Sequence, residues 1–171
     1  MARVRLEPIG QEHATDLQAT LADEPVQRYT RVPVPVPADF ASGWIGRYEE
    51  GRREGAREMF AVFDDDGGAF AGMALATGID REAAEAELGY LVVPELRGRG
   101  LAAEILGELT RWAFEEQGLH RVELVIDVTN EGSLKVARRC GYFHEGTRRS
   151  VWLKAGFPRV DATIWSRLRT D

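Results

Sequence analysis

Residues 92–103 of the chain read VVPELRGRGLAA, and this stretch decides the fold. An apolar run ends at Pro94, a turn rich in glycine and arginine follows, and Leu101 begins an apolar stripe at helical spacing. Glycines let the backbone approach a ligand closely, and the first N–H groups of a helix have no partner within it. With the helix dipole they attract a pyrophosphate, and Arg97 and Arg99 add positive charge. The stretch therefore predicts a strand–turn–helix unit that binds a phosphate group.

Apolar patterns on both sides of this turn predict an α/β fold. Residues 64–68, DDDGG, indicate a tight reversal between two strands, since Asp-Gly and Gly-Gly supply positive φ angles. Residues 32–37, VPVPVP, exclude a helix or a central strand and predict an extended loop. Strands are expected at 4–9, 59–63, 70–75, 85–93, 122–128, 142–153 and 160–168, and helices at 11–21, 40–51, 101–113 (closed by Gly118) and 130–139.

The resulting order, β-α-α-β-β-β-α-β-α-β-β, contains an antiparallel meander followed by one β-α-β crossover. Such an order predicts a mixed sheet with helices on both faces. At 171 residues, with no visible linker or repeat, the chain is expected to form one domain over residues 1–171.

Composition narrows the class of protein. The net charge of −6 argues against a nucleic-acid partner, because phosphate-backbone binding needs a concentrated basic face. One cysteine, Cys140, allows no disulfide framework, and three dispersed histidines predict no metal site. The first five residues, MARVR, lead into no apolar signal core, and no apolar run is long enough to span a bilayer. A cytoplasmic protein that uses neither membrane nor metal is expected.

A dinucleotide-binding turn competes with this interpretation. Gly98-x-Gly100-x-x-Ala103 fits the dinucleotide fingerprint, and Asp127 ends the next strand at a suitable distance. Four residues, however, separate the strand from Gly98, and only one β-α-β unit is present where that fold repeats the unit. A dinucleotide-binding oxidoreductase is therefore the secondary hypothesis.

The chain resembles the GNAT superfamily of N-acyltransferases. Residues 97–102, RGRGLA, match its Arg/Gln-x-x-Gly-x-Gly/Ala acyl-CoA motif, and residues 88–94, LGYLVVP, resemble the strand before it. Residues 130–133, NEGS, and 139–146, RCGYFHEG, resemble its later Asn-x-x-Ser and Gly-Phe-x-x-Glu-Gly region. Residues 161–168, DATIWSRL, resemble the last strand of the branch that acetylates the N-termini of ribosomal proteins.

This resemblance implies a three-layer α/β/α fold and acetyl-CoA, or another acyl-CoA, as co-substrate. The strand before the turn would pair with the pantetheine arm, and a backbone N–H near Val92 would polarise the thioester carbonyl. A splay between the strands at Val93 and Val128 would admit the cofactor. The implied cofactor-binding residues are Leu91, Val92, Val93, Arg97, Gly98, Arg99, Gly100, Leu101, Ala102, Asn130 and Ser133.

Acyl transfer to an amine needs a base and a proton donor for the leaving thiolate. Glu87 is the candidate base, because it lies on the strand that leads to the turn. Many members of the family carry a tyrosine donor where this chain has Ala137, so the resemblance to the ribosomal branch points to Ser133 instead. Asn130 has an alternative role as a helix N-cap, and Tyr142 is interpreted as a core aromatic rather than a donor.

The acceptor is expected to be a primary amine, on a protein N-terminus or on a small molecule. An α-amine, with an ordinary pKa of about 7.7–8.0, suits a modest base better than lysine does. Residues 29–44 and 148–159 would flank the acceptor, with Tyr29, Phe40 and Trp44 as pocket residues. Acetyl is the default group, and Arg148 and Arg149 could contact a larger acyl carboxylate such as succinyl.

The resemblance leaves one alternative function open, and the end of the chain bears on assembly. A non-catalytic acyl-CoA-binding effector module is the alternative function, since Ala137 removes the usual acid. The strands at the end of the chain are compatible with a homodimer.

Overall fold

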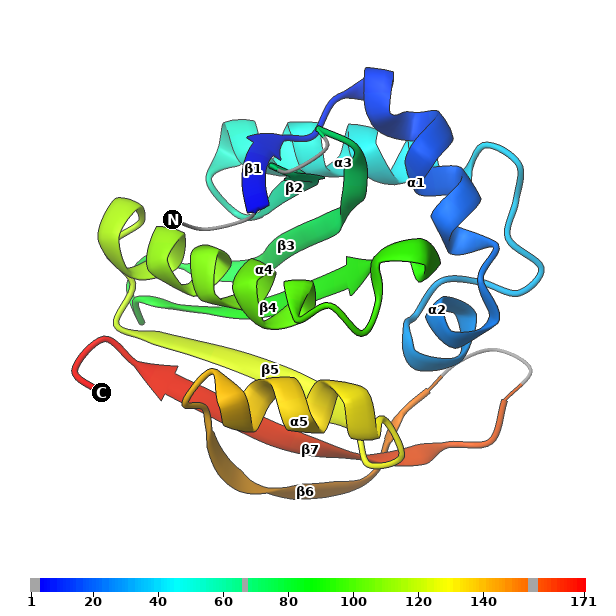
Figure 1. The fold of residues 1–171 in the computed structure, drawn as a ribbon. Helices are drawn as coiled ribbons and strands as arrows, with labels where there is room; N and C mark the ends of the chain where they lie inside the picture. Colours follow the sequence, from blue (N-terminus) through cyan, green and yellow to red (C-terminus); the bar gives the residue numbers. More distant parts are fainter. Residues whose placement is uncertain (1–3, 66–67, 154–156) are drawn as a thin grey trace.

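The computed structural model describes residues 4–65, 68–153 and 157–171, which form a seven-stranded sheet with helices on both faces (Figure 1). The strands are β1 (Val4–Pro8), β2 (Glu58–Asp64), β3 (Phe70–Asp80), β4 (Glu85–Val92), β5 (Arg121–Asp127), β6 (Phe143–Trp152) and β7 (Val160–Leu168). The α-helices are α1 (Ala14–Leu21), α2 (Glu24–Tyr29), α3 (Phe40–Glu54), α4 (Leu101–Arg111) and α5 (Glu131–Arg139). Shorter helical turns span Gln11–His13, Pro94–Leu96 and Trp112–Glu116.

The sheet has the order β1-β2-β3-β4-β5-β7-β6. Strands β4 and β5 run parallel across the α4 crossover, and the other neighbouring pairs run antiparallel. One parallel pair among the described strands does not fit a dinucleotide-binding fold, which repeats the β-α-β unit. The secondary hypothesis of an oxidoreductase is therefore wrong about the fold.

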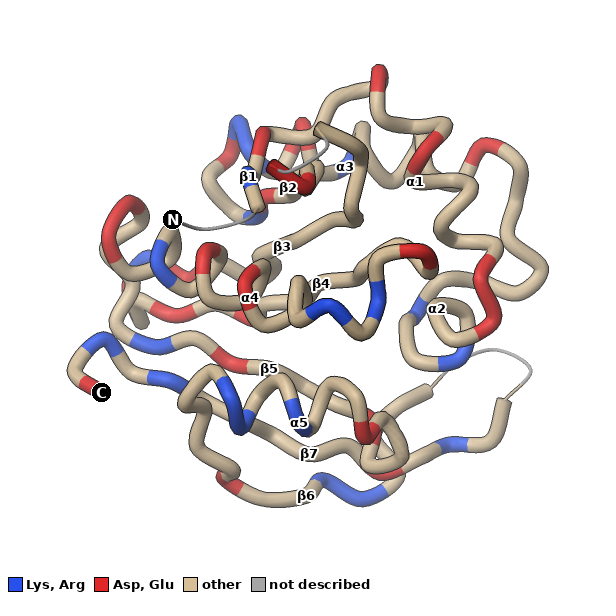
Figure 2. The backbone as a smooth tube through the Cα atoms, viewed as in Figure 1, with Lys and Arg blue, Asp and Glu red and all other residues tan. Residues whose placement is uncertain are grey.

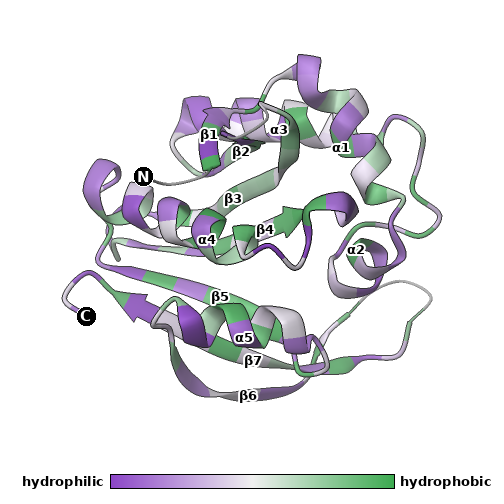
Figure 3. Ribbon diagram, viewed as in Figure 1, coloured by the Kyte–Doolittle hydropathy of each residue, from purple (hydrophilic) through white to green (hydrophobic). Residues whose placement is uncertain are grey.

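Two apolar cores hold the three layers together. One core packs α4 and α5 on one face of the sheet, through buried residues such as Ile105 and Leu124. The other packs α1 and α3 on the opposite face, through residues such as Leu17 and Ile45. The apolar stripes of these helices and the central strands are visible in Figure 3. Each strand of the centre is covered on both sides, which explains its long apolar runs.

The predicted elements agree with the observed ones except near Pro25. That proline was expected to end helical structure, but α2 begins at Glu24 and carries Pro25 in its first turn. Proline is tolerated there because the first N–H groups of a helix make no intrahelical bond. The Asp23 carboxylate caps α2 by accepting from the Val26 N–H at 3.3 Å.

Some expectations fall on parts of the chain that lie outside the described residues. Asp66 and Gly67 of the predicted reversal, residues 154–156 of the 148–159 loop, and the first three residues belong to these parts. Within the described ranges, no helix is both long and apolar enough to cross a membrane.

Candidate functional site

The site lies where β4 and β5 separate. The two strands pair only at Glu85–Arg121, Ala86–Val122 and Glu87–Glu123, and beyond Glu87 they diverge (Figure 1). A cavity of about 1060 Å³ fills the opening. Successive residues of β4 point to opposite faces of the sheet, yet 87–92 all line the cavity. The opening therefore passes through the sheet and is accessible from both of its faces.

Strand β4 leads, as predicted, into a glycine turn that lies at one end of this opening. Gly98 and Gly100 have φ angles of 75° and 86°, a left-handed conformation that glycine adopts without strain. Ala103 and Glu104 are the first residues of α4 whose N–H groups donate to the Gly100 carbonyl. The N–H groups of Leu101 and Ala102 precede them and have no acceptor inside the helix. This helix start is therefore suited to bind an anion.

Basic residues surround that helix start. In Figure 2, Lys and Arg positions mark the turn before α4 and the middle and C-terminal end of α5. Arg97, Lys135 and Arg139 line the cavity there. The Arg97 guanidinium has structural partners as well, since Nη2 pairs with the Asp23 carboxylate at 2.7 Å and Nε donates to the Val92 carbonyl at 3.1 Å. Arg97 thus joins the turn to the start of α2.

The backbone of β4 exposes hydrogen-bonding groups to the opening. The Val93 N–H donates to the Ala71 carbonyl at 2.9 Å, on the β3 side. Because backbone groups alternate sides along a strand, the N–H and C=O of Val92 face β5, where pairing has stopped. The Val92 carbonyl already accepts a hydrogen bond from the Arg97 side chain. The Val92 N–H is therefore the group of this residue that remains to donate into the cavity.

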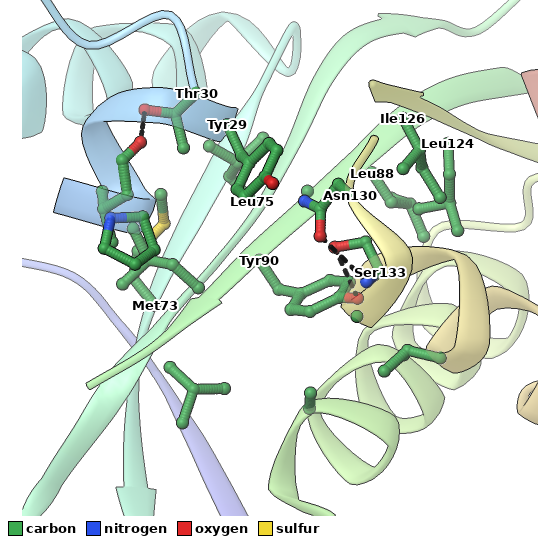
Figure 4. Close-up of a pocket in the computed structure, with 18 of the residues that line it drawn as sticks. Tyr29, Thr30, Met73, Leu75, Leu88, Tyr90, Leu124, Ile126, Asn130 and Ser133 are labelled. Carbon is green, nitrogen blue, oxygen red and sulfur yellow. Dashed lines mark hydrogen bonds between the residues drawn. The ribbon is translucent and has the colours of Figure 1, made fainter. Parts of the chain in front are cut away.

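Three polar side chains meet at the wall of the cavity (Figure 4). Asn130 caps α5 by accepting from the Ser133 N–H at 3.1 Å, as its alternative role predicted. The Tyr90 hydroxyl donates to the Ser133 Oγ at 3.4 Å, which leaves the serine O–H directed elsewhere. Burial raises the pKa of Tyr90 to about 12, although the Ser133 contact lowers it, so this phenol stays protonated at neutral pH. Sequence reasoning missed Tyr90.

The other two positions considered for the proton donor are excluded. Ala137 lies on the buried face of α5 and has no group that could donate a proton. Tyr142 is 4% exposed, and its hydroxyl lies 2.6 Å from the Thr110 Oγ1, inside the core. The prediction that Tyr142 is a core aromatic is therefore confirmed.

Glu87 lines the cavity on the face opposite to Tyr90. Burial raises the pKa of its carboxyl above the ordinary 4.5, with Glu123 adding to the rise and Arg31 and Arg148 opposing it. Tyr48, whose own pKa is raised mainly by burial, lies within electrostatic reach of Glu87. A carboxyl with this environment holds a proton more readily than a surface glutamate does, as a general base requires.

Most of the predicted site residues lie together around the opening. Val93 and Arg99 do not line the cavity, and the other predicted residues do: Tyr29, Phe40, Trp44, Glu87, Leu91, Val92, Arg97, Gly98, Gly100, Leu101, Ala102, Asn130 and Ser133. The Tyr29 hydroxyl donates to the Thr129 carbonyl at 3.4 Å, so α2 spans the mouth of the opening. Among the residues that the structure describes, no group of three or more His, Cys, Asp or Glu side chains is arranged to hold a metal ion.

Comparison with known proteins connects this geometry to a family. The model of the acetyltransferase (GNAT) domain matches residues 3–142. YdaF of Bacillus subtilis (strain 168), named as a ribosomal N-acetyltransferase, is 35% identical over 82 residues, which are 48% of this chain and 45% of YdaF. The uncharacterized N-acetyltransferase p20 of Bacillus licheniformis is 24% identical over 169 residues, covering 99% of this chain and 94% of p20. The chain thus matches less than half of the length of YdaF.

Solved structures share the whole fold. RimL, a ribosomal L7/L12 alpha-N-protein acetyltransferase in complex with coenzyme A, has a TM-score of 0.89 at 19% identity, over 98% of this chain and 95% of RimL. Spermidine N-acetyltransferase from Vibrio cholerae, in complex with CoA and spermine, has a TM-score of 0.87 at 18% identity, over 99% of this chain and 98% of the other. At such identities the likeness concerns the fold, and it confirms the predicted architecture. Since the family model covers most of the chain, the protein belongs to the acetyltransferase (GNAT) domain family.

Proposed function

We propose that this GNAT acetyltransferase moves an acetyl group from acetyl-CoA to a primary amine inside the opening between β4 and β5. The observation that carries the proposal is the early end of the β4–β5 pairing at Glu87, which leaves an opening that runs from there to the glycine turn before α4. That combination provides an anion site at one end, a strand edge along the wall and a carboxylate at the other end. The names of RimL and of the spermidine enzyme support CoA as the donor.

The residues at the opening fit acyl-CoA. The N–H groups of Leu101 and Ala102 would bind the pyrophosphate, together with the positive charge of Arg97 and Arg99. Leu91 and Val92 would lie along the pantetheine arm, and the Val92 N–H would donate to the thioester oxygen. Asn130 would hold the start of α5 in place, so that Ser133 faces the cavity.

Acetyl-CoA supplies an acetyl group activated as a thioester. In the proposed transfer, Glu87 accepts a proton from the acceptor ammonium, directly or through water, so that the neutral amine attacks. A C–N bond forms and the C–S bond breaks. Ser133 gives its proton to the departing sulfur, and the second proton of the amine leaves the new amide nitrogen and returns through water to the serine oxygen. Tyr90, still protonated, donates to that oxygen and stabilises it in the meantime. In this proposal, Ser133 and Tyr90 together take the role of the tyrosine donor that the family resemblance would place at the position of Ala137.

The function is tested by incubating the protein with acetyl-CoA and a panel of primary amines. We expect each N-acetylated product, identified by mass spectrometry, to appear with one equivalent of free CoA thiol. Binding of acetyl-CoA without any product would instead favour the non-catalytic effector module.

Tyr90 provides a more specific test of the proton path. Tyr90→Phe removes one hydrogen bond to Ser133 and is expected to lower kcat about tenfold while leaving the dissociation constant of acetyl-CoA within about twofold. Because both residues act in one step, adding Tyr90→Phe to Ser133→Ala should have no further effect. Equal, additive losses in the double variant would argue against a shared path.

Three broader properties belong to the same proposal. Residues 1–171 act as a single acyltransferase domain, as the matching fold over nearly the whole chain supports. We place the protein in the cytoplasm and assign it no nucleic-acid or membrane partner, from its charge and composition.

A homodimer would form at the sheet edge, where β6 is largely exposed and Phe143 is 71% exposed. Analytical ultracentrifugation measures this association directly.

A further inference from the structure

The charge of the cavity differs in sign from the charge of the chain. The chain has a net charge of −6, yet five basic side chains and two acidic ones line the cavity. Three of the basic residues, Arg97, Lys135 and Arg139, lie at the turn and on α5, where phosphates are expected. The other two, Arg31 and Arg47, have no such explanation.

Arg31 and Arg47 belong to the end of the cavity that holds Glu87. Arg31 acts on Glu87 electrostatically, as does Arg148 on β6. Arg47 acts on Tyr48, which itself interacts with Glu87. Glu87 precedes Val92 by five residues, or about 16 Å of extended strand. These arginines are therefore well separated from the start of α4.

Both guanidinium groups are held against aromatic rings. Arg31 lies over the Trp152 ring at 5.0 Å from its centroid, and Arg47 lies over Phe40 at 5.8 Å. Within the described parts of the chain, neither has a carboxylate at ion-pair distance. A guanidinium stacked on a ring keeps its N–H edge available for a carboxylate, which it binds through two parallel hydrogen bonds.

A hydrogen-bond donor without an acceptor lies beside Arg31, at the Glu87 end of the cavity. The indole N–H of Trp152, beside Arg31, is buried and has no hydrogen-bond partner among the described residues. A buried donor left unpaired is unfavourable. Between this corner and the strands, the lining is apolar, with Trp44, Met73 and Leu75.

We propose that the acceptor is a primary amine that also carries a carboxylate, with its amine at Glu87 and its carboxylate at Arg31, where that guanidinium lies over Trp152. The proposal rests on the function proposed above and names the substrate class for the same site. A polyamine fits poorly, because its second ammonium would meet the arginines and be repelled. The carboxylate can come from a free amino acid or from an acidic side chain near a peptide N-terminus.

The test compares acceptors that differ only in the carboxylate. One arm uses 5-aminovalerate against pentylamine, and another uses peptides whose second residue is glutamate against glutamine. Spermidine is the polycation control. We expect kcat/KM to be at least about tenfold higher for the carboxylate member in the arm that represents the true source.

Arg31→Gln should remove this preference. It is expected to lower the ratio of kcat/KM for the carboxylate acceptor to kcat/KM for its carboxylate-free counterpart about 10- to 100-fold, and to leave the affinity for acetyl-CoA within about twofold. Arg28→Gln is the matched control, because Arg28 lies on α2 over Tyr29 and does not line the cavity. It should change neither value.

The outcomes are distinguishable. Faster acetylation of amines without a carboxylate, or of spermidine, by the wild type, or an unchanged preference in Arg31→Gln, overturns the acceptor class and leaves the acetyltransferase function standing. Binding of acetyl-CoA with no acetylation in any arm contradicts the proposed function itself, and the acceptor class with it.

Discussion

Glu87→Gln is expected to lower kcat/KM for amine acetylation about 10²- to 10⁴-fold, or by about 3–5 kcal/mol of transition-state stabilisation. The amide keeps the size of the side chain and its place in the cavity but cannot accept the amine proton. Affinity for acetyl-CoA should stay within about twofold, because Glu87 lies far along β4 from the glycine turn. Steady-state kinetics together with calorimetric titration measure both quantities.

The pH profile gives this prediction a second readout. Burial raises the pKa of Glu87 above 4.5, and its protonated form cannot act as a base. For the wild type, the reactive pair is the Glu87 carboxylate with the acceptor ammonium, so the slope of log kcat/KM against pH should fall from about 1 to about 0 as pH rises through this pKa. In Glu87→Gln the slope should stay at about 1 until the amine itself loses its proton.

Glu85→Gln is the matched control for Glu87. Glu85 lies on the same strand, is exposed, and does not line the cavity. Its substitution should leave kcat/KM within about twofold. Equal losses in both variants would indicate a general effect of charge on this strand, and an active Glu87→Gln would exclude Glu87 as the base.

Gly98→Asp is expected to raise the dissociation constant of acetyl-CoA about 10²-fold. The new carboxylate would lie beside the pyrophosphate site, and two like charges about 6 Å apart at an effective dielectric constant of about 20 repel by about 3 kcal/mol. Gly98 has a φ of 75° and open space where a Cβ would be. Aspartate adopts this conformation more readily than most residues, so the fold should persist.

Gly118→Asp separates charge from backbone strain. Gly118 has a φ of 69° and equally open surroundings, but it lies at the far end of the α4 segment, away from the cavity. The two variants should lose similar thermal stability, while only Gly98→Asp loses affinity for acetyl-CoA. Equal affinities in both would place the pyrophosphate elsewhere.

Much of the fold was predictable because its signals are local. The apolar run of β4, the glycine turn and the stripe of α4 follow one another without interruption, and each has its own periodicity. Helix α2 was missed because Pro25 is a helix breaker in most positions, and only the Asp23 cap reveals that it lies in a first turn.

The site was less predictable because it depends on contacts between distant segments. Strand alternation places Tyr90 on the face opposite to Glu87, so alternation alone does not predict that both line one cavity. Both line it because β4 and β5 diverge, and the length of their pairing is a tertiary property. The Arg97–Asp23 pair joins residues 74 positions apart, and no sequence pattern predicts it.

The most direct test of the account is a crystal structure of the protein with acetyl-CoA. We predict the pyrophosphate at the N–H groups of Leu101 and Ala102, the pantetheine arm between β4 and β5, and the sulfur within hydrogen-bonding distance of the Ser133 Oγ. Acetyl-CoA bound outside this opening, or a sulfur directed away from Ser133 and Tyr90, would contradict it.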